Sequence, residues 1–231
     1  MSSHYRRTAR ASTSVAGFQL AELMLSIFIF SIVGGLCFYA AASGFRIFAN
    51  TNSRQTLQRD ARAVFAWLQR DVGLSNLIRC ERAERLVGSD RRDVLAVAAM
   101  DSWQQPIAAD GLGLPAWNRL VVYEATDNSR GLLLRQLYTP PAGAIPLQAQ
   151  TVENMLATLV SGAVGSFNPT DQRRLSGSVR HFEVELSEAR NTAVFDLILT
   201  EDTVQAGSGR ARAEVLQVKT TIFPRNTWPR L

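Results

Sequence analysis

The sequence predicts an α+β protein, in which a long N-terminal helix precedes an antiparallel β-sheet and packs its second half against that sheet. Three observations predict it. An uncharged apolar run extends from Leu23 to Phe45. An amphipathic pattern of helical period follows, and no proline interrupts residues 18–80. Short apolar or alternating segments separated by turn residues then occupy most of residues 81–231, which favours a sheet packed on the helix.

The composition is that of a globular protein with a small charge excess. The chain has 231 residues, 46% of them hydrophobic, and a net charge of +5. Residues 1–17 hold three of the 25 basic residues and no acid, so the rest of the chain has 22 basic against 20 acidic residues. Nucleic-acid binding needs a concentrated basic face, and we expect none. The arginines between residues 79 and 92 alternate with acids and predict a solvated surface of mixed charge.

The apolar run is long enough to cross a membrane. Its 23 residues would span about 35 Å as a helix, against a hydrocarbon core of about 30 Å. The leader before it, SHYRRTARASTS, is basic, so the positive-inside rule predicts a cytoplasmic leader and a translocated chain from residue 50 onward. Arg46, just after the run, acts against this orientation.

Two processing sites compete. A secretory signal peptide would be cut after Ala42, in the small-residue stretch YAAASG. The apolar run is too long for that class, however, and it has a carboxylate, Glu22, at its start. The other site is the bond between Gly17 and Phe18, where cleavage would leave the apolar helix on the mature protein.

The stretch GFQLAE, Gly17 to Glu22, resembles the processing motif of type IV prepilins and pseudopilins. The resemblance implies cleavage after Gly17 by a prepilin peptidase and N-methylation of Phe18. The stretch differs from the family motif at Gln19, where many members have threonine. The resemblance also implies a fold of the pilin type, with residues 1–17 as leader, 18–48 as membrane and assembly helix, 49–80 as its amphipathic continuation and 81–231 as a β-rich extracytoplasmic domain.

Physical chemistry gives Glu22 a role in this scheme. Cleavage creates an α-amine on Phe18 at the edge of the hydrocarbon, one helical turn from Glu22. Each charge is costly alone in a membrane, and the two are tolerable as a pair. In a filament the amine can belong to a neighbouring subunit, so the pair also sets the axial register. The alternative is that the Glu22 side chain only reaches to the membrane interface.

Small residues on the apolar helix favour close helix–helix contacts. Ser31 and Gly35 are four residues apart, as are Ala40 and Gly44. Gly34 and Gly35 together are expected to weaken the helix locally and to replace the helix-breaking proline of many filament pilins.

After Phe48 the pattern predicts a helix with one buried stripe and a break near residues 73–76. The stripe consists of Leu57, Ala61, Val64, Phe65, Leu68 and Val72. We expect strands at 94–100, 119–125, 132–138, 181–187, 193–200 and 215–223, a short helix at 152–164 and a polar loop at 201–211.

A narrower resemblance joins two distant segments. LQRDARAVFAWLQRDV, containing Arg70 and Asp71, resembles the helix of J-type pseudopilins and W-type minor pilins. The end of the chain resembles their closing strand, with Arg225 and Asn226 as its final pair and Pro224 inserted before them. The middle of the chain gives no family match.

Few residues offer catalytic or metal-binding chemistry. The chain has two histidines, His4 and His181, which leaves little from which to build a catalytic triad or a histidine metal site. Cys37 and Cys80 are badly placed to pair, so we predict neither a disulfide nor a zinc site, and we expect no cofactor. Trp103, Trp117 and Trp228 are candidates for contact surfaces or core positions.

The sequence thus predicts a non-enzymatic subunit of a type IV pilus or a type II secretion pseudopilus. By the resemblance its partners are a prepilin peptidase, other pilins or pseudopilins and an inner-membrane assembly platform, and it lies near the filament tip. The rival prediction is a Sec-exported or single-pass anchored periplasmic binding domain with no filament role. An enzyme, a small-molecule substrate and a nucleic-acid partner are not expected.

Overall fold

The structure is a computed structural model that describes residues 15–100, 117–128, 130–139, 149–160, 169–204 and 211–225. The chain divides into two compact units, residues 1–49 and residues 50–231. The basic leader before Val15, the tryptophans Trp103 and Trp228, and Asn226 lie outside the described residues.

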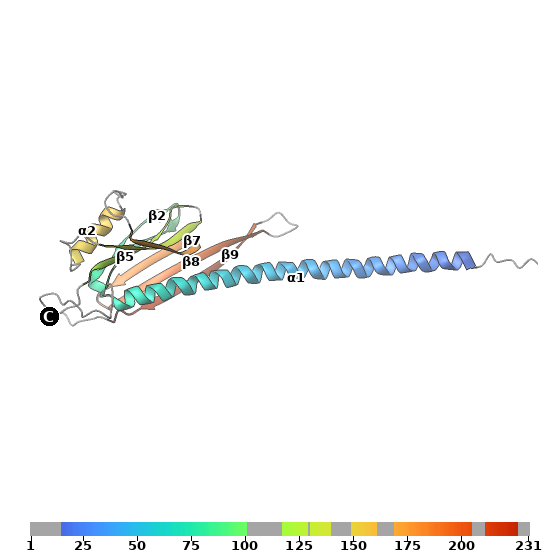
Figure 1. Cartoon of the computed structure of the whole chain (residues 1–231), viewed down its shortest axis with the longest axis horizontal. Helices are drawn as coiled ribbons and strands as arrows, with labels where there is room; N and C mark the ends of the chain where they lie inside the picture. The colour runs from blue at the N-terminus through green and yellow to red at the C-terminus, as the bar shows by residue number, and fades with distance from the viewer. Residues whose placement is uncertain are drawn as a thin grey trace, which may run out of the picture. The chain divides into compact units, whose positions relative to one another are not determined.

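The first element is the helix α1, Val15–Leu74, which is drawn from blue to green in Figure 1. The prediction of one long helix is confirmed, and it ends within the predicted break at 73–76. The 3-10 helix η1, Leu77–Arg79, follows it, and Asn76 caps η1 because its side-chain oxygen accepts a hydrogen bond from the backbone N–H of Ile78. The helix is not interrupted at Gly34 and Gly35, so these glycines do not replace a helix-breaking proline.

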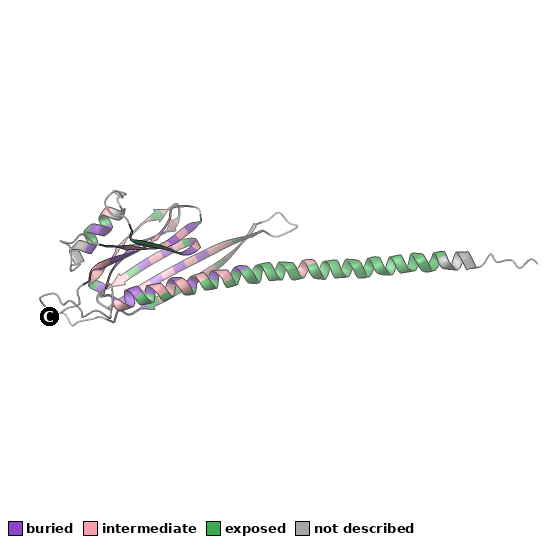
Figure 2. Cartoon of the chain, viewed as in Figure 1, coloured by how far each residue is buried: buried purple, intermediate pink, exposed green. Residues whose placement is uncertain are grey.

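The second half of α1 buries the predicted stripe. Five of its six residues are at most 4% exposed, and Phe65 lies half-buried at its margin; the five are Leu57, Ala61, Val64, Leu68 and Val72. Figure 2 shows the buried positions recurring along this part of the helix. The helical period of the apolar residues therefore identified the packed face correctly.

A seven-stranded antiparallel sheet forms the body of the second unit, which confirms the predicted α+β class. Its order is β1-β4-β5-β6-β7-β8-β9, and β2 and β3 form a separate hairpin. The strands are β1 (Cys80–Ala83), β2 (Leu86–Val87), β3 (Asp90–Arg91), β4 (Val94–Ala99), β5 (Arg119–Ala125), β6 (Gly131–Tyr138), β7 (Asp171–Ser187), β8 (Thr192–Val204) and β9 (Ala211–Ile222).

Several boundaries differ from the predictions. Strand β7 begins at Asp171, ten residues before the predicted start at His181, and β8 extends through residues 201–204 of the predicted loop. The first residues of β7 are exposed and charged, so no apolar alternation marks them, and backbone pairing with β6 forms this part of the strand. The short helix α2 spans Ala149–Val160, and residues 161–164 of its predicted range lie outside the described residues.

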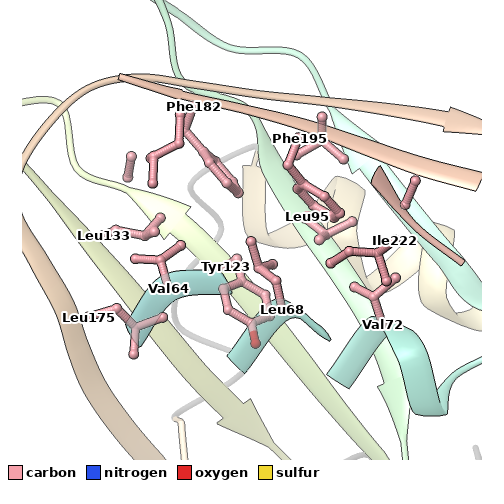
Figure 3. Packing of buried hydrophobic residues seen from close by; sticks show 14 of the residues in the cluster. Val64, Leu68, Val72, Leu95, Tyr123, Leu133, Leu175, Phe182, Phe195 and Ile222 are labelled. Carbon is pink, nitrogen blue, oxygen red and sulfur yellow. The ribbon is translucent and has the colours of Figure 1, made fainter. Parts of the chain in front are cut away.

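Two apolar clusters cover the two faces of the sheet. Leu95 and Val97 of β4 face the larger cluster, which contains the stripe of α1 and is shown in part in Figure 3. Val94, Ala96 and Ala98 face the smaller one, which contains α2 and Trp117. Strand β4 is buried on both faces, and this explains why it is a continuous apolar run rather than an alternating one.

The predicted solvated surface at the arginine-rich segment 79–92 is partly wrong. Arg92 is 2% exposed and its neighbour Asp93 is fully buried. The Arg92 guanidinium donates hydrogen bonds to the backbone oxygens of Thr126 and Asn128, and the Asp93 carboxylate accepts one from the backbone N–H of Val184. Their burial is tolerated because they satisfy backbone groups of the turn between β5 and β6 and of β7, which sequence alternation does not reveal.

A buried polar contact joins α1 to the middle of the sheet. The Asp71 carboxylate accepts hydrogen bonds from the Tyr123 hydroxyl at 2.6 Å and from both arms of the Arg135 guanidinium at 2.6 and 3.2 Å. Burial raises the pKa of Tyr123, and the negative charge of Asp71 raises it further. Burial lowers the pKa of Arg135, but its bond to Asp71 outweighs this and the pKa lies above its ordinary value. Each polar group in this contact therefore has a partner.

We predict that Asp71→Ala lowers the free energy of unfolding by about 3–5 kcal/mol, because Arg135 would remain charged and buried without its carboxylate. The measurement is urea unfolding of the full chain in a nonionic detergent. The matched control is Asp171→Ala, which breaks an exposed pair with Arg173 and should cost less than about 1 kcal/mol. Equal losses for the two variants would contradict the assigned role of Asp71.

Gly131 has no room for a side chain. A Cβ placed there would lie 2.5 Å from the Val179 oxygen and 3.1 Å from the Arg92 guanidinium. Gly131→Ala should therefore destabilise the protein by about 1–3 kcal/mol in the same assay. The matched control is Gly73→Ala, the same chemical change within a helix, where an added Cβ would meet nothing within 4 Å. This variant should leave the free energy of unfolding unchanged or raise it by up to about 1 kcal/mol.

Candidate functional site

The first candidate site is the apolar part of α1. Its large side chains between Leu20 and Phe48 are exposed, with exposed fractions from 48% at Ile32 to 79% at Phe30. By length and composition α1 is able to cross a membrane. Contiguous apolar surface of this extent marks a membrane or a protein interface, because water would otherwise have to solvate it.

Two hydroxyl groups on this segment, those of Ser26 and Ser31, form hydrogen bonds within the helix. Ser26 donates to the backbone oxygen of Glu22 and Ser31 donates to that of Ile27, each at 2.8 Å. A hydroxyl bonded to the preceding turn carries no unpaired donor into an apolar medium. The two serines are therefore compatible with a lipid environment.

Glu22 is the only charged residue between Val15 and Phe45, and it is exposed. Its carboxylate has no hydrogen bond or ion pair with any residue that the structure describes. A carboxylate at the start of an apolar helix needs a cation in a low-dielectric environment. The described residues supply no such cation, so the carboxylate either pairs with a group outside them or reaches to the membrane interface.

The structure places the predicted processing bond in the first turn of α1. Gly17 and Phe18 are the third and fourth residues of the helix, and their side chains lie outside the described part of the chain. The first four N–H groups of a helix lack internal partners, so this turn opens at small cost. Phe18 and Glu22 are four residues apart on the same helix, which places them on one face.

The glycines of the apolar segment contact no side chain among the residues that the structure describes. A Cβ added at Gly34, Gly35 or Gly44 would meet nothing within 4 Å. These positions therefore leave the helix backbone accessible to a neighbouring helix, as the spacing of Ser31 with Gly35 and of Ala40 with Gly44 predicts.

The second candidate site is a groove within residues 50–231 that the sequence did not predict. It has a volume of about 770 Å³ and lies between the end of α1 and the end of β9. Its lining residues are Phe65, Ala66, Gln69, Arg70, Gly73, Leu74 and 220–225. Arg70 and Arg225, which belong to the two segments of the narrower family resemblance, both line it. No sequence signal predicts that they lie close together, because they are 155 residues apart.

The residues with nucleophilic or metal-binding side chains are not gathered into a site. Within the described part of the chain, no three His, Cys, Asp or Glu side chains form a metal-binding group. His181 is half-buried, and its Nδ1 accepts a hydrogen bond from the Arg91 backbone N–H. Cys37 and Cys80 are both free thiols. Trp117 is a core residue, with the Arg79 guanidinium carbon 3.9 Å from its ring centre.

No protein-family model, curated protein or solved structure matches this chain.

Cys80 should be inert in the folded protein. Burial raises the pKa of its thiol to about 12; a hydrogen bond with Ser75 lowers it to a smaller extent, and the charge of Glu81 raises it. The reactive thiolate is then scarce at any physiological pH. In a Cys37→Ser variant we expect no maleimide labelling at pH 8 in nonionic detergent and complete labelling in urea, measured by mass spectrometry. Fast labelling of the folded variant would contradict the buried position.

Proposed function

We propose that this protein is a minor pilin or pseudopilin, a structural subunit that is cut after Gly17 and enters a filament through its N-terminal helix. The filament is a type IV pilus or a type II secretion pseudopilus. Before assembly the subunit lies in a bacterial inner membrane, with its leader in the cytoplasm and residues 50–231 in the periplasm. Its partners are a prepilin peptidase, other pilins or pseudopilins and the assembly platform.

The observation that carries this proposal is the carboxylate of Glu22, which lies at the start of an exposed apolar helix and has no partner among the residues that the structure describes. A plain membrane anchor gains nothing from such a group, which costs at least about 2 kcal/mol in the hydrocarbon. Cleavage after Gly17 supplies the missing cation as the α-amine of Phe18. The amine of a neighbouring subunit is an equally good partner, and pairing with it fixes how far the two helices are shifted along the filament axis.

The rest of the helix supports the same role. Its exposed glycines allow a neighbouring helix to approach the backbone closely, and such small residues are typical of helix contacts in membranes. The buried positions of α1 in the second unit begin at Ser53, and its apolar stripe begins at Leu57. The segment before these positions remains available, first to lipid and then to other subunits, so the transfer from membrane to filament does not require the domain to unfold.

The test begins with the N-terminus of the protein isolated from cells that contain a prepilin peptidase. Mass spectrometry should find an N-methylated Phe18 as the first residue, with residues 1–17 removed. A start at Ser43 would mean an exported domain without its helix. An intact Met1 would mean a plain anchor. Either result would overturn the proposal and favour a periplasmic domain with no filament role.

Glu22→Ala should leave cleavage intact and reduce incorporation into sheared filaments at least about tenfold, because one charge of the pair is then left alone. The matched control is Ser26→Ala, one turn along the helix, which removes only an internal hydrogen bond and should assemble normally. Normal assembly of Glu22→Ala would remove the assembly role of this carboxylate.

A further inference from the structure

One side of the β9 backbone pairs with no strand among the residues that the structure describes. Strand β9 is the last strand of the sheet, and within the described residues it pairs only with β8. The β8–β9 ladder runs from Ala193↔Ile222 to Val204↔Ala211 without a register shift. Proteins usually protect such an edge with a bulge, a proline or a covering element, and β9 contains no bulge and no proline. An extended segment can therefore add to it by backbone hydrogen bonds.

The groove between α1 and β9 reaches this edge at the end of the strand. Its lining includes Thr220, Thr221 and Ile222, the last three residues of β9 in succession, and residues 223–225, which follow the strand. Side chains of a strand alternate between the two faces, so one face of β9 would contribute only every second residue. A run of consecutive residues is instead what the backbone edge contributes. The Arg225 N–H donates to the Gly73 oxygen at 2.9 Å, and this bond joins the two walls at one end.

The charged residues that line the groove are all positively charged. Arg70 and Arg225 line it, both side chains are exposed, and no acid lines it. Neither arginine forms an ion pair with a residue that the structure describes. The Arg70 guanidinium carbon lies 5.2 Å from the centre of the Trp67 ring, which restricts its position. Phe65, Leu74 and Phe223 supply apolar surface beside the two cations.

We propose that this groove binds an extended, acidic segment of another protein chain, which adds to β9 as a further strand and places its carboxylates near Arg70 and Arg225. The backbone edge of β9 can pair with a ligand whose backbone is extended, and the two arginines attract a ligand that is negatively charged. A second copy of this chain fits poorly, because its own β9 and the residues that follow the strand would bring Lys219 and Arg225 into the groove. The acid of that strand, Glu214, already pairs with Arg54 at 3.3 Å.

The test uses the full chain in a nonionic detergent and a fluorescein-labelled heptapeptide, TVEVEVT, as the probe. Fluorescence anisotropy gives its Kd. We expect binding with a Kd below 1 mM, at least tenfold weaker binding of the neutral peptide TVQVQVT, and loss of binding when alternate amides of TVEVEVT are N-methylated. The first comparison tests the charge requirement, and the second tests strand addition.

Two matched double variants distinguish binding in the groove from a general effect of the protein's positive charge. Arg70→Gln combined with Arg225→Gln should weaken binding of TVEVEVT at least tenfold. Arg62→Gln combined with Arg190→Gln removes the same charge from exposed positions outside the groove and should leave the Kd unchanged. Hydrogen exchange should slow at the backbone amides of residues 219–223 when the peptide is added.

Four results would overturn the proposal: no binding up to 1 mM, equal binding of the acidic and neutral peptides, equal losses for the two double variants, or a dimer of this chain that depends on Arg70 and Arg225. None of them bears on cleavage after Gly17, because the groove lies within residues 50–231 and the proposal does not depend on processing.

Discussion

The carboxylate of Asp71 holds the second unit together at the point where its helix meets its sheet. It is 7% exposed, lies next to the last buried residue of the α1 stripe, and binds side chains from β5 and β6 at once. Apolar packing alone tolerates small sliding of a helix on a sheet, because it has no directional preference. Hydrogen bonds have a preferred direction and do not tolerate such sliding. The two bonds from Arg135 and the one from the Tyr123 hydroxyl therefore fix the register of α1 on the sheet. The positions of Gly73 and Arg225, and with them the groove, depend on that register.

The helix α1 serves two environments with one continuous backbone. Its second half is amphipathic, and the sheet buries one stripe of it from Leu57 to Val72. Its first half is apolar on every face, and the structure leaves those side chains exposed from Leu20 to Phe48. This division separates stability from function in the proposed scheme. The globular unit is stabilised by its own sheet and stripe, while the first half of the helix is free to exchange lipid for other helices.

The two candidate sites differ in how far the sequence could reveal them. Gly17, Phe18 and Glu22 lie within six residues, so spacing along the chain is sufficient to recognise the motif. The groove joins residues 65–74 to residues 220–225, and only the folded chain brings these segments together. The same limit explains Arg92 and Asp93. The residues around them in sequence suggest a solvated surface, whereas their partners include backbone groups far away in the chain, at Thr126 for Arg92 and at Val184 for Asp93.

The sequence by itself determined the helix, its apolar and amphipathic halves, the buried stripe and the strands whose apolar residues repeat with a clear period. These features follow from local periodicity, which is written in consecutive residues. Only the tertiary structure decided the strand order, the polar start of β7, the burial of Arg92 and the partners of Asp71. Each of these depends on hydrogen bonds between residues far apart in the chain. Such bonds do not require a periodic pattern of residue types, so the sequence does not reveal them.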